Sequence, residues 1–168
     1  MRFKVPDDAK TIAISGSRVW ENVGAMKAYC SIVASTIAQS GIERVFVGDA
    51  MGVDAEITTA LYNREVWVTV HHVFGMPRNA LMIPQGVSTR RVTVAGSTNQ
   101  EKYTNRDHYI IDKADLWLGI WNGKSPGTPA AYRYARDTGK LHALAKFTDG
   151  TMYITRCNYK PNGGTNGK

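Results

Sequence analysis

The sequence has few cysteines and no long run of apolar residues. Its two cysteines, Cys30 and Cys157, lie far apart and outside any Cys-x-x-Cys or cysteine–histidine cluster. We therefore expect no disulfide framework and no metal site. No apolar run is long enough to cross a bilayer, and the first ten residues contain no apolar segment of the signal-peptide kind. These absences predict a cytoplasmic protein that does not contact a membrane.

The two most familiar nucleotide-binding motifs are also missing. Neither Gly-x-Gly-x-x-Gly nor the Walker pattern Gly-x-x-x-x-Gly-Lys-Ser/Thr occurs. An NAD-dependent dehydrogenase and a P-loop ATPase are therefore poorly supported, and we predict no cofactor.

The composition is that of a globular chain with a basic surface. Of the 168 residues, 43% are hydrophobic, enough for one domain with a sizeable core. The net charge of +7 fits a polyanion such as DNA or RNA, or a few cations around a small phosphate ligand. The basic residues are dispersed, with Arg90–Arg91 as the longest cluster, which favours the small ligand.

Apolar runs and helical spacings alternate along the chain. This alternation predicts an α/β protein in three layers, with a Rossmann-like, doubly wound and mainly parallel sheet. Residues 1–150 form the expected single domain, and residues 151–168 a C-terminal extension that is partly flexible. Strands are expected at residues 11–15, 44–47, 66–74, 91–95, 116–121 and 141–147, and helices at residues 23–37, 53–61, 105–113 and 129–138.

Two segments are harder to interpret. Residues 75–100 are interrupted by prolines and glycines, and beyond the strand at 91–95 they hold either a short helix at 79–82 or an irregular flap. The extension contains a candidate strand at 152–155 and ends in PNGGTNGK, which we expect to be a frayed tail.

The stretch from Asp115 to Thr128, DLWLGIWNGKSPGT, carries the clearest functional signal. A short apolar run is followed by a loop of small, donor-rich residues, and Thr128 and Pro129 suit the cap and first turn of a helix. A strand, a glycine-bearing loop and a helix N-terminus in that order direct free N–H groups at one point. This arrangement predicts an anion site, for phosphate above all.

Two further strand-end loops have the same character, one at residues 16–18 and one at residues 48–54. Because parallel strands present their carboxyl ends at one edge of a sheet, we expect the three loops to converge on one ligand. Glycines allow close approach to the backbone, and hydroxyls, amides and cations can bind phosphate oxygens. The predicted ligand-binding residues are Gly16, Ser17, Arg18, Gly48, Asp49, Gly52, Arg106, Lys124, Ser125, Gly127 and Thr128.

These motifs together carry a family resemblance. The strings ISGSR, VGDAMGVDAE and YTNRDHYIIDKADLWLGIWNGKSPGT, with the alanine-rich helix that follows, resemble the SLOG superfamily. That superfamily includes the Smf/DprA DNA-processing proteins, the LOG phosphoribohydrolases and the YspA- and YpsA-like proteins. The similarity covers residues 11–147 except for 75–100. It implies a Rossmann-like sheet that binds a nucleotide or nucleic-acid phosphate, and it suggests N-glycosidic bond chemistry.

The resemblance also implies roles for individual residues. Residues 16–18 correspond to the first phosphate-facing loop, and residues 125, 127 and 128 to the phosphate loop. Gly48, Gly52 and Asp54 correspond to the second loop, where the acid would hold a ribose hydroxyl or the loop itself. Arg106 corresponds to the arginine before the next helix.

One departure bears on catalysis. LOG proteins and deoxyribosyltransferases carry a glutamate where this chain has Ala130 and Ala131, and a methyl group cannot act on a sugar as a carboxylate does. A substitute acid could come from Asp49, Asp54, Glu56 or Asp107, and we consider Asp54 and Glu56 the catalytic candidates. Trp121, at the end of its strand, is a candidate for stacking on a base.

The sequence thus predicts a protein that binds a nucleotide or a nucleotide-derived small molecule by its phosphate. One alternative is an N-glycosidase or deoxyribosyltransferase-like enzyme with a relocated carboxylate. Another is a DprA-like binder of single-stranded DNA. A homodimer through the helix at residues 23–37 remains open, and the small size and basic charge are compatible with a phage or mobile-element protein.

Overall fold

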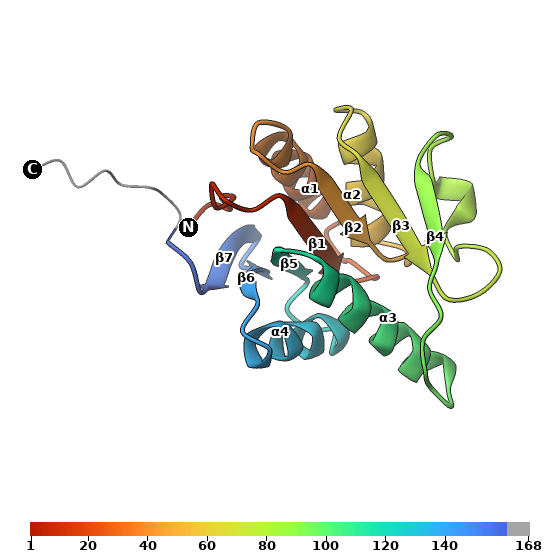
Figure 1. Ribbon diagram of the computed structural model, residues 1–168. Helices are drawn as coiled ribbons and strands as arrows, with labels where there is room; N and C mark the ends of the chain where they lie inside the picture. Colours follow the sequence, from red (N-terminus) through yellow and green to blue (C-terminus); the bar gives the residue numbers. More distant parts are fainter. Residues whose placement is uncertain (161–168) are drawn as a thin grey trace, which may run out of the picture.

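We describe the protein from a computed structural model, in which residues 1–160 are described. The frayed tail expected at 161–168 lies outside the described residues. Figure 1 shows a central sheet with helices on both faces. The elements are, in chain order, β1 Thr11–Gly16, α1 Val23–Ala38, β2 Arg44–Val47, α2 Val53–Tyr62, β3 Val68–His72, the short 3₁₀ helix η1 Ala80–Met82, β4 Ser88–Arg91, α3 Asn99–Lys113, β5 Leu116–Trp121, α4 Gly127–Asp137, β6 Leu141–Thr148 and β7 Thr151–Cys157.

The sheet order is β4-β3-β2-β1-β5-β6-β7. Every pair of neighbouring strands is parallel except β6 and β7, which are antiparallel. The chain builds outward from β1 to β4 and then returns to the other side of β1 with β5, so the topological switch point lies between β1 and β5. The predicted doubly wound, mainly parallel α/β fold is confirmed.

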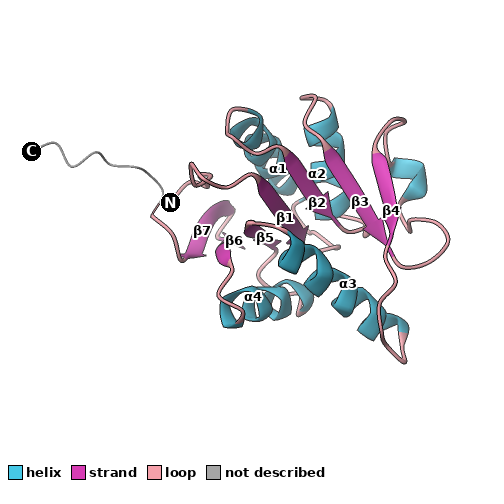
Figure 2. Ribbon diagram, in the orientation of Figure 1, coloured by secondary structure: helices cyan, strands magenta, loops and turns pink. Residues whose placement is uncertain are grey.

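The helices form two layers around the sheet. Figure 2 shows α1 and α2 on one face and α3 and α4 on the other. Strand β5 accounts for this arrangement, because its alternate side chains enter different cores: Leu118 packs in the core beneath α1 and α2, whereas Trp117 packs in the core beneath α3 and α4. Among residues 1–160, no helix has the combination of length and hydropathy that crossing a membrane requires.

The segment at residues 75–100 differs from the prediction. The strand expected at 91–95 is wrong: β4 comes earlier, at Ser88–Arg91, and all four of its residues are exposed. As the edge strand of the sheet, β4 is held by main-chain pairing with β3 and buries no side chain, so its polar sequence gives no strand signal. The short helix expected at 79–82 is present only as the single turn of η1.

Helix α3 begins six residues earlier than expected. Thr98, and not Thr104, is its N-cap: the Thr98 hydroxyl accepts a bond of 3.1 Å from the Glu101 N–H, and the Glu101 carboxylate accepts one of 3.3 Å from the Thr98 N–H. This complete capping box satisfies two N–H groups at once. The extra turns place Tyr103 and Thr104 beside the site described below.

A substitution at Gly119 tests how tightly the central strand is packed. A Cβ atom at Gly119 would lie 2.3 Å from the Trp117 ring and 2.9 Å from Leu144. We expect Gly119→Ala to reduce the free energy of unfolding by about 1 to 3 kcal/mol, because the buried ring must shift. Gly127→Ala is the matched control, since a Cβ there meets no atom within 4 Å. Denaturant unfolding of both variants checks this, and equal stabilities would contradict the packing.

Candidate functional site

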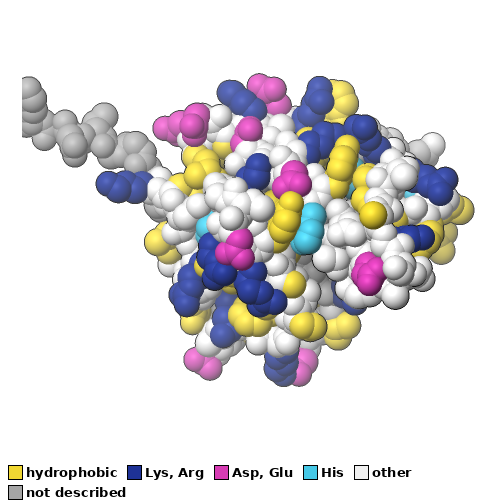
Figure 3. Space-filling model, turned by 60° about the horizontal axis from the view of Figure 1, so that its bottom comes forward, with side chains coloured by type: hydrophobic (Ala, Val, Ile, Leu, Met, Phe, Trp, Pro, Cys, Tyr) yellow, Lys and Arg dark blue, Asp and Glu magenta, His cyan; other side chains and the backbone are white. Residues whose placement is uncertain are grey.

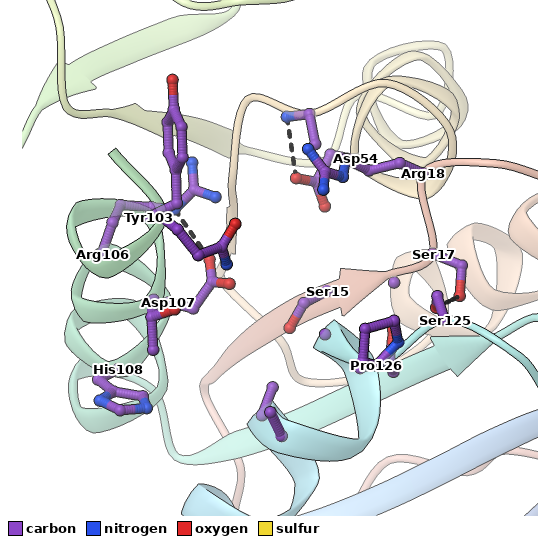
Figure 4. A pocket seen from close by; sticks show the side chains of 18 of the residues that line it. Ser15, Ser17, Arg18, Asp54, Tyr103, Arg106, Asp107, His108, Ser125 and Pro126 are labelled. Carbon is purple, nitrogen blue, oxygen red and sulfur yellow. Dashed lines mark hydrogen bonds and ion pairs between the residues drawn. The ribbon is translucent and has the colours of Figure 1, made fainter. Parts of the chain in front are cut away.

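An open cavity of about 450 Å³ lies at the carboxyl end of β1, the strand at the switch point. Figure 4 shows its three walls: α3, the turn that precedes α2, and the loop that leads into α4. It is lined by Ser15, Gly16, Ser17, Arg18, Ala50, Asp54, Arg78, Gln100, Tyr103, Thr104, Arg106, Asp107, His108, Ser125, Pro126, Gly127, Thr128, Ala130, Ala131 and Arg133. The loops after β1 and β5 therefore meet as predicted.

Hydroxyl groups connect these two loops. The Oγ atoms of Ser17 and Ser125 are 2.6 Å apart, and the Ser17 Oγ also accepts a bond of 3.0 Å from the Asn122 N–H. Ser17 is buried, so this contact is shielded from water. Both hydroxyls are thus engaged within the protein, and they fix the position of the loop before α4.

The N-terminus of α4 is open toward the cavity. The Asn122 side chain accepts bonds from the N–H groups of Lys124 and Ser125, but no side chain caps the helix. Thr128 is not the N-cap as expected: Pro126 takes that position with φ of −82°, and Thr128 is buried inside the first turn. The proline ring fixes a helical φ early, so the helix starts one residue before Thr128. The first N–H groups of a helix have no acceptor within it, so those of Gly127 and Thr128 can receive an anion.

Four arginines line the cavity, and they fall into two pairs. Arg18 and Arg133 are exposed, and within residues 1–160 neither guanidinium has a hydrogen bond or an ion pair. Arg18 comes from the loop after β1 and Arg133 from α4. Among the four arginines of the cavity, this pair is therefore the one that no carboxylate of residues 1–160 compensates.

The other two arginines share one buried carboxylate. Asp49 Oδ1 accepts a bond of 2.7 Å from Arg106 and one of 2.8 Å from Arg78, and Arg106 also bonds to Asp107 at 2.8 Å and to the His71 carbonyl at 3.1 Å. Burial alone would raise the pKa of Asp49, but its bonds to Arg78 and the charges of both arginines outweigh this and hold the pKa below its usual range. Asp49 thus stays ionised beneath the cavity.

Arg78 forms part of the cavity wall together with Tyr103. Its guanidinium lies 3.6 Å from the centroid of the Tyr103 ring, as in a cation–π contact. The Arg78 side chain is 27% exposed, so part of it faces solvent. The segment at residues 75–100, which the family resemblance does not cover, therefore contributes directly to the site.

Asp54 is the one acidic side chain of the cavity that has no cationic partner. It is buried, and its Oδ2 accepts a bond of 3.1 Å from the Ala50 N–H. Its Oδ1 is also buried and has no hydrogen-bond partner. Burial, the largest influence, raises the pKa of Asp54 to about 7, although the charge of Arg106 opposes the change.

This raised pKa makes the stability depend on pH. The pKa of the Asp54 carboxyl is 3.8 in the unfolded chain, so the folded protein binds this proton more tightly than the unfolded chain does. The proton therefore stabilises the fold fully below pH 3.8, and this contribution is lost as the pH rises to about 7. We expect Asp54→Asn to gain about 2 kcal/mol of stability relative to the wild type between pH 5 and pH 7. Unfolding curves at both pH values measure this, and an unchanged difference would show that Asp54 titrates normally.

Other predicted residues lie beneath the cavity or beside it. Gly48 lies below Arg106 and Asp54, since a Cβ at Gly48 would come within 2.7 Å of both side chains. Gly52 has φ of +75° and packs against the carbonyl oxygens of residues 17 and 18, where a Cβ would come within 2.5 Å. Both glycines therefore allow the turn at 48–54 to approach its neighbours, and neither lines the cavity.

Like Gly48, Asp49 and Gly52, three further predicted residues do not line the cavity. Lys124 forms an exposed ion pair with Glu21 at 2.6 Å. The indole N–H of Trp121 donates to the Ser125 carbonyl at 2.8 Å. Glu56 is partly exposed on α2.

Sequence reasoning missed Arg78 and Arg133. Arg133 follows Ala130 by one helical turn, so the two residues share a face of the predicted helix. This spacing could have predicted that Arg133 lies beside the site. No comparable signal exists for Arg78, because its position depends on the bond to Asp49 from a segment without regular structure.

No protein-family model matches the chain, and no curated protein matches it. Solved structures do match the chain. The molybdenum cofactor binding protein from Rippkaea orientalis is 15% identical, with a TM-score of 0.64 over 83% of this chain and 77% of that chain. DNA processing protein A from Helicobacter pylori, described for its single-stranded DNA binding mode, is 16% identical, with a TM-score of 0.62 over 85% of this chain and 68% of that chain.

The Moco carrier protein from Chlamydomonas reinhardtii is a third neighbour. It is 14% identical, with a TM-score of 0.58 over 80% of this chain and 75% of that chain. At these identities the likeness concerns the fold. DNA processing protein A represents the Smf/DprA group, whose motifs the sequence resembles. The chain therefore shares a Rossmann-like fold with these three proteins.

Proposed function

We propose that this protein binds a nucleotide or a nucleotide-derived small molecule, with a phosphate group held between the N-terminus of α4 and the side chains of Arg18 and Arg133. One observation carries the proposal: an uncapped helix N-terminus and two uncompensated guanidinium groups line the same cavity. Free N–H groups, the helix dipole and arginine all favour a bound anion.

The charge balance of the cavity supports an anionic ligand. Asp49 and Asp107 are bonded to Arg78 and Arg106, so the four charges of this network largely cancel. The charges of Arg18 and Arg133 remain, opposed only by Asp54, whose pKa of about 7 leaves it partly neutral at pH 7. A phosphate with one or two negative charges would balance this excess.

The size and lining of the cavity favour a small molecule with a planar ring. A volume of about 450 Å³ is in the usual range for small-ligand sites. The Arg78 guanidinium, stacked on Tyr103, offers a flat surface on which a heterocyclic ring could stack. Two of the structural neighbours are named for binding or carrying the molybdenum cofactor, which accords with a small-molecule ligand.

Asp54 favours a second candidate function, cleavage or transfer at an N-glycosidic bond. Such chemistry needs a carboxyl group near the sugar, and Asp54 is an acid in the cavity with a pKa near neutrality. Ala130 and Ala131 line the same cavity and supply none. Incubation with nucleoside monophosphates would release free base, and Asp54→Asn would abolish the release; no turnover of any nucleotide would exclude this function.

Mass spectrometry of the small molecules released on denaturation tests the proposed binding. We expect a phosphate-bearing nucleotide or nucleotide derivative in an amount close to that of the protein. The competing outcome is a purified protein that carries no small molecule and that retards a single-stranded oligonucleotide in a gel at low salt. In that case the affinity for the oligonucleotide should fall as the salt concentration rises. Figure 3 shows where such a strand could contact the α3 and α4 face, because lysine and arginine side chains gather in one area of it.

A further inference from the structure

A second cavity, of about 380 Å³, lies beside the loop that joins β5 to α4. The segment after β1 at residues 19–22, the loop residues 122–124 and the end of β6 with its turn at residues 146–149 line it. None of these residues lines the first cavity, which the same loop borders through residues 125–128. The volume is in the usual range for small-ligand sites, so the second cavity is large enough for a separate ligand.

One part of the second cavity is aromatic. Trp20 and Phe147 meet edge to face, with ring centroids 6.3 Å apart and an angle of 72° between the ring planes. The Trp20 indole N–H already donates to the Ser17 carbonyl at 2.8 Å, so its polar atom is satisfied within the protein. The two rings therefore offer an apolar surface, which favours an apolar or aromatic group of a ligand.

Four charged side chains, two of each sign, line the same cavity. Lys124 and Glu21 pair with each other at 2.6 Å. Lys146 and Asp149 form no ion pair and no side-chain hydrogen bond within residues 1–160, and the Lys146 ammonium lies 5.0 Å from the centroid of the Trp121 ring. The cavity is thus neutral as a whole, and it keeps one cation and one carboxylate available to a ligand.

The hairpin of β6 and β7 carries both of these groups. Asp149, with φ of +50°, and Gly150, with φ of +80°, form the tight turn between the two strands. Two successive positive φ values are those of a type I′ turn, in which Asp-Gly is favoured. Gly123 lets the Lys146 side chain pass close to the loop, since a Cβ at Gly123 would lie 3.4 Å from Lys146 Cε.

A zwitterion with an apolar side chain matches this set of groups. We propose that the second cavity binds a free α-amino acid with a large apolar side chain, with its carboxylate at Lys146, its ammonium at Asp149 and the side chain against the two aromatic rings. A free amino acid carries both charges close together at pH 7, whereas a peptide carries them at opposite ends. This inference goes beyond nucleotide binding and does not depend on it, because the two cavities share no lining residue.

NMR titration of the full chain tests the inference, with L-phenylalanine, L-tryptophan and L-leucine as probes. We expect saturable shifts with at least one of them, largest at the Trp20 indole N–H and the amides of Gly123 and Thr148. The N-acetyl derivative of the best-bound amino acid lacks the ammonium, and its amide derivative lacks the carboxylate. Each derivative should bind roughly 10-fold more weakly than the amino acid, the effect of one hydrogen bond to a charged group.

Two variants assign the contacts. Asparagine tolerates the positive φ at Asp149, and methionine keeps the apolar stem of Lys146, so Asp149→Asn and Lys146→Met should both fold. Asp149→Asn should weaken binding of the amino acid roughly 10-fold and spare the N-acetyl derivative, whereas Lys146→Met should weaken it similarly and spare the amide derivative. Glu43→Gln and Lys27→Met change exposed residues outside both cavities, and each should stay within about threefold of the wild type.

Several outcomes would contradict the inference and leave nucleotide binding untouched. Absence of saturable shifts with all three amino acids at millimolar concentration would exclude the site. Equal binding of the N-acetyl derivative would mean that the cavity takes an apolar anion and does not recognise an ammonium. Shifts that are largest at Gly127 and Thr128 would place the amino acid in the first cavity. Unchanged affinity in both Asp149→Asn and Lys146→Met would overturn the assigned contacts.

Discussion

Asp49→Ala is expected to destabilise the protein by about 3 to 5 kcal/mol, because it leaves the buried charge of Arg106 with too few partners. Asp49 is 1% exposed and accepts bonds from both Arg106 and Arg78. The backbone N–H of Arg78 also donates to it, at 2.9 Å. The substitution therefore removes the three bonds that tie Arg78 to the turn after β2 and weakens one wall of the cavity.

Denaturant unfolding at pH 7 measures this loss. Asp137→Ala is the matched control, since it breaks an ion pair with Arg136 of the same length, 2.8 Å, in which both side chains are more than half exposed. Exposed pairs of this kind contribute about 0 to 1 kcal/mol. Similar losses in the two variants would contradict the view that Asp49 holds the arginine network together.

The double variant Arg18→Ala/Arg133→Ala is expected to bind nucleotide roughly 100- to 1000-fold more weakly than the wild type. Each guanidinium that bonds to a phosphate contributes about 1.5 to 3 kcal/mol, and the two losses add incompletely when they act on one group. Because both side chains are exposed, the folded protein should keep its stability.

Calorimetric titration of the ribonucleotide that binds best checks this prediction. Arg136→Ala is the control on the same helix: it removes an arginine that pairs with Asp137 and does not line the cavity. We expect that variant to bind within about threefold of the wild type, apart from a small general charge effect. An equal loss in both variants would mean that binding follows the net charge of the protein and needs no specific pair.

The central strands of the sheet could be predicted from the sequence because their hydrophobic pattern is clear. Strands β2 and β5 were predicted with their observed bounds, since apolar runs bounded by polar residues are typical of strands buried on both faces. Edge strand β4 could not be predicted, because its pairing depends on the main chain and its side chains are exposed. The predicted starts of α3 and α4 were wrong because more than one residue near each start could begin the helix, as Thr98 and Thr104 both could for α3.

The location of the candidate site followed from topology, and its chemistry depends on details that topology does not contain. The meeting of the loops at residues 16–18 and 122–128 was predictable from their places at the ends of β1 and β5. Three details depend on tertiary contacts that the sequence does not reveal. These are the burial of Asp54, the hydrogen bond between the Ser17 and Ser125 hydroxyls, and the position of Arg78 beside Asp49. The sequence therefore predicts where a ligand would bind better than which atoms would bind it.

The central claim, that a phosphate binds at the N-terminus of α4, is tested most directly by amide NMR spectra during a titration with the best-bound ribonucleotide. We predict saturable shifts that are largest for the N–H groups of Gly127 and Thr128, and that weaken in the Arg18→Ala/Arg133→Ala variant. Small shifts dispersed over the basic surface, with these two amides unchanged, would contradict the claim.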